Sequence, residues 1–396
     1  KMNLELRFKE LSDFLQGWSN FIDLEPIRKY PNHIVPQIED WIREIKEASE
    51  YELIELENSF LFQTENQDFQ EFLAKIKSLI HFNSPIKKPS PLEFTTKMKE
   101  KKRHEIEIIA SMLDGIDKVN FIDIGGGAGY LTENLVNNRE RFSFSIDMNK
   151  KLQESGAKRI NQNSEQNFKK VQFLLNNFGE DPYPLITGRF HDNYVIGLHS
   201  CGDLSPHLLR YTVNQKIKSV LSLGCCYHKL TDQYNLSSLA QMSGLLLTKN
   251  SLNLATRGYS YQTIAGLKRK IKIRKYRYGL HLYLFSLGHH NFIPTGRTNL
   301  SDYDKTFSEY ASIYAGELIK SSTDAEAFYK KDESQMEIKD IIAIDLIRGL
   351  FGRVIEAYLT VDRALYLKEN GYQVQITELF DRRLSPRSLA IQAHLP

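Results

Sequence analysis

A glycine-rich string, Asp123-Ile-Gly125-Gly-Gly127-Ala-Gly129, constrains the fold of this 396-residue chain more than any other feature. It follows the apolar run Val119–Ile124 and precedes Tyr130-Leu-Thr-Glu-Asn-Leu-Val, so we expect it where a buried strand turns into a helix. Glycines at such a junction let backbone N–H groups approach a ligand beside the helix N-terminus. A dinucleotide fingerprint needs its third glycine at position 130, which is Tyr, so the spacing argues against NAD.

Further apolar runs predict an α/β fold with a Rossmann-like sheet. Residues 142–147, 171–175, 193–199 and 218–224 have the length expected of parallel strands that are covered on both faces. Residues 372–379 and 388–392 alternate between polar and apolar like the last two strands, which predicts a closing antiparallel hairpin.

All three cysteines lie in two short strings that follow the fourth and fifth of these strands. The strings are His199-Ser-Cys201-Gly-Asp203 and Gly224-Cys225-Cys226-Tyr-His228. Ligands of open α/β sheets bind outside the carboxyl ends of the strands, near the point where the strand order reverses. We therefore expect one reaction centre there, with these candidate catalytic residues: His199, Cys201, Asp203, Cys225, Cys226 and His228.

An acidic residue inside the strand followed by Gly-x-Gly-x-Gly resembles motif I of the class I S-adenosylmethionine-dependent methyltransferases. The resemblance implies S-adenosylmethionine as cofactor, with Asp147 accepting the ribose hydroxyls and Asn176 and Asn177 contacting the adenine. The alternative is an ordinary tight turn followed by ordinary polar loop residues. The expected cofactor-binding residues are Asp123, Gly125, Gly127, Gly129, Asp147, Asn176 and Asn177.

Longer motifs resemble the methyltransferase-like protein 25 family, which includes the ribosomal-RNA-adenine-dimethylase-domain-containing protein. The matching strings begin at Met98, Gly197, Gly224 and Leu379, and the likeness spans roughly residues 95 to 396. It implies a class I fold and a methyltransferase whose substrate the likeness leaves undefined. The His-x-Cys-Gly and Cys-Cys-x-His pair is also similar to motifs of the tRNA 2′-O-methyltransferases that modify the acceptor stem, which suggests RNA.

Composition indicates an ordinary globular protein, with 41% hydrophobic and 26% charged residues. No tract approaches twenty apolar residues, and the N-terminal residues lack the apolar core of a signal peptide. We expect an intracellular, cytoplasmic protein, or a nuclear one in a eukaryote, without a membrane partner. Three cysteines, two of them adjacent, make no disulfide framework.

Charge and helical periodicity divide the chain into four expected segments. Residues 1–94 predict a helical N-terminal domain. The first 95 residues carry 11 Lys/Arg against 17 Asp/Glu, a charge of −6, and because the whole chain has a net charge of +3, the remainder carries +9. A Pro-rich linker at 84–91 precedes the cofactor-binding core, residues 95–231. Residues 232–370 predict a helical, basic insertion between strands five and six, and 371–396 the closing hairpin.

The insertion carries a strongly basic segment. Between Thr248 and Arg297 there are ten Lys/Arg and no Asp or Glu. Such residues could neutralise phosphates, which favours RNA (rRNA or tRNA) as partner; the alternative is a basic face that covers an acidic neighbour, with a protein or small-molecule acceptor. The candidate nucleic-acid contacts are Lys268, Arg269, Lys270, Lys272, Arg274, Lys275 and Arg277.

Several chemistries remain open for the two strand-end strings. For methyl transfer from a sulfonium, the enzyme must mainly orient the acceptor and the methyl donor, and it needs a general base only if the acceptor carries a proton of high pKa. His199 or His228 could be that base, and Asp203 could orient the histidine. The strings could instead only shape a pocket, in an enzyme or in a cofactor-binding protein without turnover. We expect no metal, although zinc could bind His199, Cys201, Cys225, Cys226 and His228. A cysteine thiolate could also attack a pyrimidine, as in RNA cytosine-5 methyltransferases. The Pro-Cys and Thr-Cys motifs of those enzymes are missing from this sequence, which argues against that mechanism.

Overall fold

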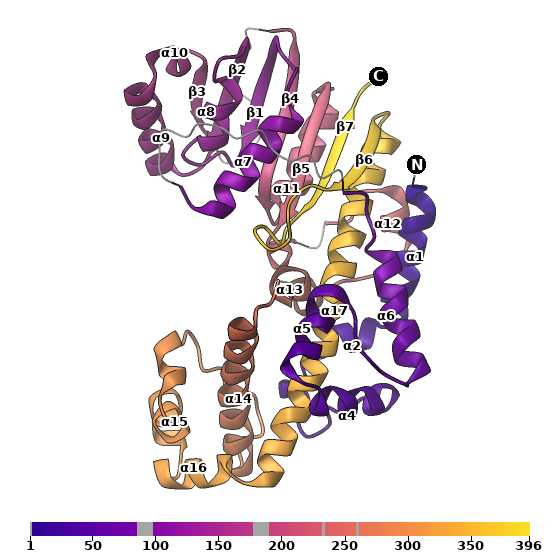
Figure 1. Cartoon of the computed structure of the whole chain (residues 1–396), viewed down its shortest axis with the longest axis vertical. Coiled ribbons are helices and arrows are strands. Elements are labelled where there is room, and N and C mark those ends of the chain that lie inside the picture. Colours follow the sequence, from indigo (N-terminus) through magenta and orange to yellow (C-terminus); the bar gives the residue numbers. More distant parts are fainter. Residues whose placement is uncertain (1, 85–97, 177–189, 232–233, 259–260) are drawn as a thin grey trace. The chain divides into compact units, whose positions relative to one another are not determined.

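The computed structural model describes residues 2–84, 98–176, 190–231, 234–258 and 261–396 (Figure 1). The chain forms two compact units. The first, which we call the sheet unit, comprises Lys1–Gly17, Leu79–Arg257 and Arg353–Pro396. The second, the helical unit, comprises Trp18–Ser78 and Gly258–Gly352.

A seven-stranded sheet with the order β3-β2-β1-β4-β5-β7-β6 organises the sheet unit (Figure 1). Neighbouring strands from β3 to β5 pair in parallel, and the strand order reverses between β1 and β4. Every residue of β1 is buried, because the sheet is covered on both faces. The strands are β1 (Val119–Ile124), β2 (Arg141–Asp147), β3 (Val171–Leu175), β4 (Asp192–Cys201), β5 (Ser219–Cys225), β6 (Gln373–Glu378) and β7 (Leu389–His394).

The last two strands confirm the expected closing hairpin. β6 pairs antiparallel with β7, and β7 inserts antiparallel beside β5. Five parallel strands closed by this hairpin agree with the Rossmann-like sheet that the apolar runs predicted and with the class I methyltransferase fold that the resemblance implied. The fold class is therefore α/β, with helices before the sheet and a helical insertion between the fifth and sixth strands.

Helices of the sheet unit provide its core and position the strand ends. Ile106 and Ile109 of α7 and Leu135 of α8 pack in one cluster with Phe121 and Leu221 of the sheet. These helices include α1 (Leu4–Gly17), α7 (Glu100–Met112), α8 (Tyr130–Val136), α9 (Lys150–Asn163), α10 (Glu165–Phe168), α11 (Leu204–Asn214), η2 (Tyr227–Lys229), α12 (Ser238–Met242), α13 (Lys249–Asn253) and the π-helical turn η3 (Leu254–Gly258).

The helical unit has an aromatic core of its own. Trp41 stacks on Phe69 at 4.8 Å between ring centroids, and Trp18 lies 5.6 Å from Phe351. Its elements are α2 (Ser19–Asp23), α3 (Pro26–Lys29), η1 (Pro36–Ile38), α4 (Glu39–Glu47), α5 (Glu50–Ser59), α6 (Gln67–Leu79), α14 (Ile264–Ser286), η4 (Leu300–Asp304), α15 (Phe307–Ala315), η5 (Gly316–Leu318) and α16 (Ser322–Tyr329).

The units cut across the four segments expected from the sequence. Helix α1 belongs to the sheet unit, because Phe8 packs on Tyr358 and Glu5 pairs with Lys368. The long helix α17 (Asp332–Glu369) begins in the helical unit and ends in the sheet unit. Among the described residues, no helix combines the length and the apolar character that crossing a membrane requires.

Candidate functional site

The glycine string forms a tight loop between β1 and α8. Gly125, Gly127 and Gly129 have positive φ angles of 76°, 56° and 67°, a region that glycine enters without a steric penalty. A Cβ on Gly129 would lie 2.8 Å from Phe173 Cζ, so the loop also packs too closely for a side chain there. The backbone conformation explains why the string needs glycine at these positions.

Asp147 lies at the end of β2 beside this loop. Its Oδ2 accepts a hydrogen bond from Gly127 N at 3.0 Å, and its Oδ1 accepts one from Asn149 N at 2.8 Å. Asn176, directly after β3, donates its backbone N–H to the Asp147 carbonyl at 3.2 Å. Because an ionised carboxylate has about four acceptor positions, two remain for ribose hydroxyls, and the site fits the expected cofactor. Asn177 lies outside the described residues.

Asp123 is buried in β1, with 2% of its surface exposed. Burial raises the pKa of Asp123 to about 6, although a hydrogen bond from Thr132 at 2.8 Å and the charge of Lys102 act in the opposite direction. Lys102 Nζ lies 4.1 Å from the centroid of Tyr130, the residue that occupies the third glycine position of a dinucleotide loop. Helix α7 therefore places a cation next to the cofactor loop.

The ends of β4 and β5 are irregular. Gly197 pairs with Ser222, but Ser200 pairs with Gly224. From one pair to the next, β4 therefore advances by three residues while β5 advances by two, which is a β-bulge. His199, inside this bulge, has a φ of +58°, which is rare for a residue with a side chain. The extra residue places Cys201 opposite Cys225 in the register.

The structure brings the three cysteines together, as the sequence predicted. The Sγ atoms of Cys201 and Cys225 lie 2.9 Å apart, those of Cys201 and Cys226 3.4 Å, and those of Cys225 and Cys226 3.8 Å. The hydrogen bond with Cys225 lowers the pKa of Cys201 to about 6 against the effect of burial. The same bond, with burial, raises the pKa of Cys225, and burial raises that of Cys226.

The histidines and Asp203 have separate partners. His199 Nε2 lies 2.7 Å from Glu105 Oε1 of α7, and Ser385 Oγ donates to the same oxygen at 2.6 Å. Burial raises the pKa of Glu105, but His199 and Ser385 outweigh burial and hold it below its usual range. Asp203 Oδ1 accepts from Thr231 N at 2.9 Å, so the carboxylate next to His199 is Glu105 rather than Asp203. His228 N donates to Thr256 Oγ1 at 3.2 Å.

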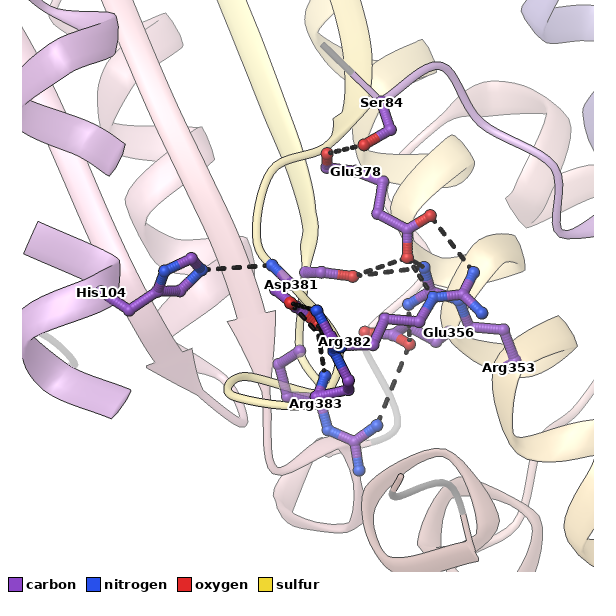
Figure 2. Close-up of polar contacts among 10 residues, drawn as sticks. Ser84, His104, Arg353, Glu356, Glu378, Asp381, Arg382 and Arg383 are labelled. Atoms are coloured by element: carbon purple, nitrogen blue, oxygen red, sulfur yellow. Dashed lines mark hydrogen bonds and ion pairs between the residues drawn. The ribbon is translucent and has the colours of Figure 1, made fainter. Parts of the chain in front are cut away.

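The segment after β6 is held by a network of charged residues (Figure 2). Buried Arg353 binds Glu356 at 2.7 Å and Glu378 at 2.9 Å, and Glu378 also binds Arg382 and Ser388. His104 Nε2 accepts from the backbone N–H of Asp381 at 3.2 Å (Figure 2). These contacts fix the loop that carries Ser385.

Ion pairs involve four of the seven basic candidates, which lie on α14 in the helical unit. Lys270 binds Glu57 at 2.5 Å, Lys268 binds Glu50 at 3.2 Å, and both acids come from α5 of the acidic N-terminal region. Lys272 pairs with Asp304 and Arg274 with Asp345. Among the described carboxylates, none forms an ion pair with Arg269, Lys275 or Arg277.

Sequence reasoning gave no site role to four residues near these strand ends: Lys102, Glu105, Thr132 and Ser385. Glu105 and Ser385 lie in strings that resembled the family, so a signal was present. Their partners, however, are 94 and 280 residues away along the chain, and no local pattern reveals such a pairing.

Comparisons with known proteins agree with this fold. The family model described as "Methyltransferase domain" matches residues 97–233. "Probable methyltransferase-like protein 25" of Homo sapiens is 52% identical over 44 residues, which are 11% of this chain and 7% of that protein. The Mus musculus protein of the same description is 48% identical over 44 residues, with the same coverage. The match thus spans only a small part of these relatives.

Solved structures resemble the chain at low identity. The 23S rRNA methyltransferase ErmE is 16% identical, with 32% of this chain and 47% of that chain covered at a TM-score of 0.24. Coclaurine N-methyltransferase bound to N-methylheliamine and SAH is 13% identical, with 88% and 89% covered at a TM-score of 0.28. The domain match identifies residues 97–233 as a methyltransferase domain, and the strand order of the sheet is that of the class I methyltransferase fold.

Proposed function

We propose that this chain is an S-adenosylmethionine-dependent methyltransferase that binds its cofactor at the carboxyl ends of β1, β2 and β3. The observation that carries the proposal is the Asp147 carboxylate, which Gly127 N and Asn149 N hold beside the positive-φ glycine loop. Gly125, Gly129 and Asn176 complete this cofactor site, and Asp123 supports the loop from within β1. When bound, the cofactor supplies a methyl group on a positively charged sulfur.

The acceptor belongs at the ends of β4 and β5, next to the reversal of strand order. Leu204, the first residue of α11, supports this placement, because its Cδ2 lies 3.4 Å from the position of a Cβ on Gly125. Cys201 and His199 precede this residue on β4 and its bulge. Glu105 positions the His199 ring at this edge through their 2.7 Å contact.

The charge pattern of α14 supports our proposal for the acceptor class. Four of the seven basic candidates already pair with carboxylates, so the helix offers a phosphate backbone fewer free cations than its sequence suggests. An acceptor without a polyanionic backbone, a protein side chain or a small molecule, fits this surface better. An RNA acceptor is the second candidate, and it would have to use Arg269, Lys275 and Arg277.

Radiolabelled methyl transfer to fractionated extracts from cells that lack the protein tests both parts. We expect label in the protein or small-molecule fraction. Label confined to RNA would overturn the acceptor class while supporting the methyltransferase. No label in any fraction, from protein that binds the cofactor, would contradict the proposed activity.

Salt dependence separates the two acceptor classes further. If RNA binds through α14, replacing Arg269, Lys275 and Arg277 by Gln should flatten the dependence of log K on log salt by about one unit per lost contact. Replacing Lys268 and Lys270, which pair with Glu50 and Glu57, is the matched control. We expect that replacing Arg269, Lys275 and Arg277 leaves RNA affinity unchanged. A flattened dependence of log K on log salt would instead support RNA as the acceptor.

A further inference from the structure

Three sulfur atoms from two strands and the turn that follows converge on one point in the sheet unit. Cys201 ends β4, Cys225 ends β5, and Cys226 is the next residue along the chain. Their Sγ atoms all lie within 4.8 Å of one another, and among the described residues this is the one group of three or more His, Cys, Asp or Glu side chains with that property. These three are also all the cysteines of the chain.

Backbone geometry brings these sulfurs together against the ordinary alternation of a strand. Successive residues of a strand point to opposite faces, so Cys225 and Cys226 would normally be separated. Cys226 instead has a left-handed φ of +48°, which turns its side chain to the same side. The bulge at His199 sets Cys201 opposite Cys225. Each such conformation is sterically unfavourable for a residue with a Cβ.

The distances fit a tetrahedral metal ion. Zinc binds thiolates at about 2.3 Å, which places two sulfurs of a regular tetrahedron about 3.8 Å apart. Cys225 and Cys226 already have this separation, and Cys201 lies 3.4 Å from Cys226. Both distances from Cys201 must widen, that to Cys225 from 2.9 Å by about 0.9 Å and that to Cys226 by about 0.4 Å, and Cys201 is exposed at its strand end.

We propose that Cys201, Cys225 and Cys226 together bind one zinc ion and leave its fourth coordination position open. Neither His199 nor His228 joins the group of converging ligand atoms among the described residues. His199 Nε2 instead lies 2.7 Å from Glu105 Oε1. Three protein ligands with an open position are the pattern of catalytic rather than structural zinc. The site lies at the carboxyl ends of β4 and β5, where the acceptor is placed. The catalytic role of the ion rests on the proposed function, whereas the metal site does not.

Metal content and cobalt substitution test the site without an activity assay. Full-length protein purified with reductant and without chelators should retain about one equivalent of zinc. Cobalt added to the metal-free protein should give the intense charge-transfer absorption of several thiolate ligands. Absence of zinc, failure to take up zinc or cobalt, or a cobalt spectrum without thiolate bands would each overturn the proposal, as would a Cys201–Cys225 disulfide that persists under reductant.

Single substitutions assign the ligands. Cys226→Ser should weaken zinc binding by more than about 100-fold, since losing even an outer-shell partner costs 10- to 100-fold. His228→Gln is the control and should bind zinc like the wild type; a comparable loss would make His228 the fourth ligand and overturn the open position. S-adenosylhomocysteine binding to the metal-free protein is measured separately. If the protein binds S-adenosylhomocysteine but no zinc, only the metal site is wrong; if it binds zinc but no S-adenosylhomocysteine, the proposed methyltransferase function is wrong.

Discussion

At the residue scale, buried Asp123 makes the stability of the sheet unit depend on pH. Its pKa is raised by burial from 3.8 to about 6, so its favourable contribution is complete below about pH 4 and is lost as the pH rises through 6. Asp123→Asn cannot titrate. We expect the stability of this variant relative to wild type to increase by about 3 kcal/mol between pH 4 and pH 8, because one pKa unit is worth about 1.4 kcal/mol.

Urea unfolding at a series of pH values measures this difference. Ile122→Val, a non-titrating change in the same strand, is the control and should cost about 1 kcal/mol at every pH. A difference between Asp123→Asn and wild type that stays constant with pH would show that Asp123 is ionised in the folded protein without penalty.

Gly129 combines two constraints that a substitution can separate. Gly129→Ala meets both a φ of +67° and a Cβ position 2.8 Å from Phe173 Cζ. Gly115→Ala meets a φ of +80° with no atom within 4 Å, so it measures the backbone term alone. We expect Gly115→Ala to lower the free energy of unfolding by about 1 kcal/mol and Gly129→Ala by about 1–3 kcal/mol more. Equal losses in denaturant unfolding would mean that Phe173 moves aside freely.

At the scale of elements, Arg353 joins α17 to β6. Its side chain is 0% exposed and binds Glu356 and Glu378 (Figure 2). Arg353→Met leaves two carboxylates without their shared cation, so we expect a loss of about 3–5 kcal/mol in the free energy of unfolding. Lys150→Met breaks the exposed pair with Glu154 and should cost less than about 0.5 kcal/mol. Similar small losses for both variants would show that the Arg353 network contributes no more than a surface pair.

Most strands of the sheet could be predicted from the sequence, because runs of apolar residues mark the segments that become buried. The expected strands 142–147 and 171–175 agree with β2 and β3, and the closing hairpin forms as expected. The bulge at His199 and the left-handed Cys226 were not predicted, since both depart from the regular alternation on which strand prediction depends. The pairing of Lys270 with Glu57 also needed the structure, because 213 residues separate them.

At the scale of the whole molecule, the chain passes between its two units four times. Residues 1–17 belong to the sheet unit, 18–78 to the helical unit, 79–257 to the sheet unit, 258–352 to the helical unit and 353–396 to the sheet unit. Composition shifts and a Pro-rich stretch suggest boundaries between consecutive segments, so sequence reasoning treated residues 1–94 as one domain. The division after Gly17 has no such signal in the sequence, because Leu11 and Leu15 of α1 follow the same helical periodicity as the apolar residues of the helices after it.

Calorimetry of S-adenosylhomocysteine binding tests the central claim of the account most directly. Asp147 is expected to accept two charge-assisted hydrogen bonds from the ribose, so Asp147→Ala should weaken binding by about 100-fold or more. Glu154→Ala, which removes an exposed carboxylate from the neighbouring α9, is the matched control and should bind like wild type. Wild-type binding that depends on Asp147 but not on Glu154 is the predicted result. Absence of binding by the wild type at saturating concentrations would contradict the account.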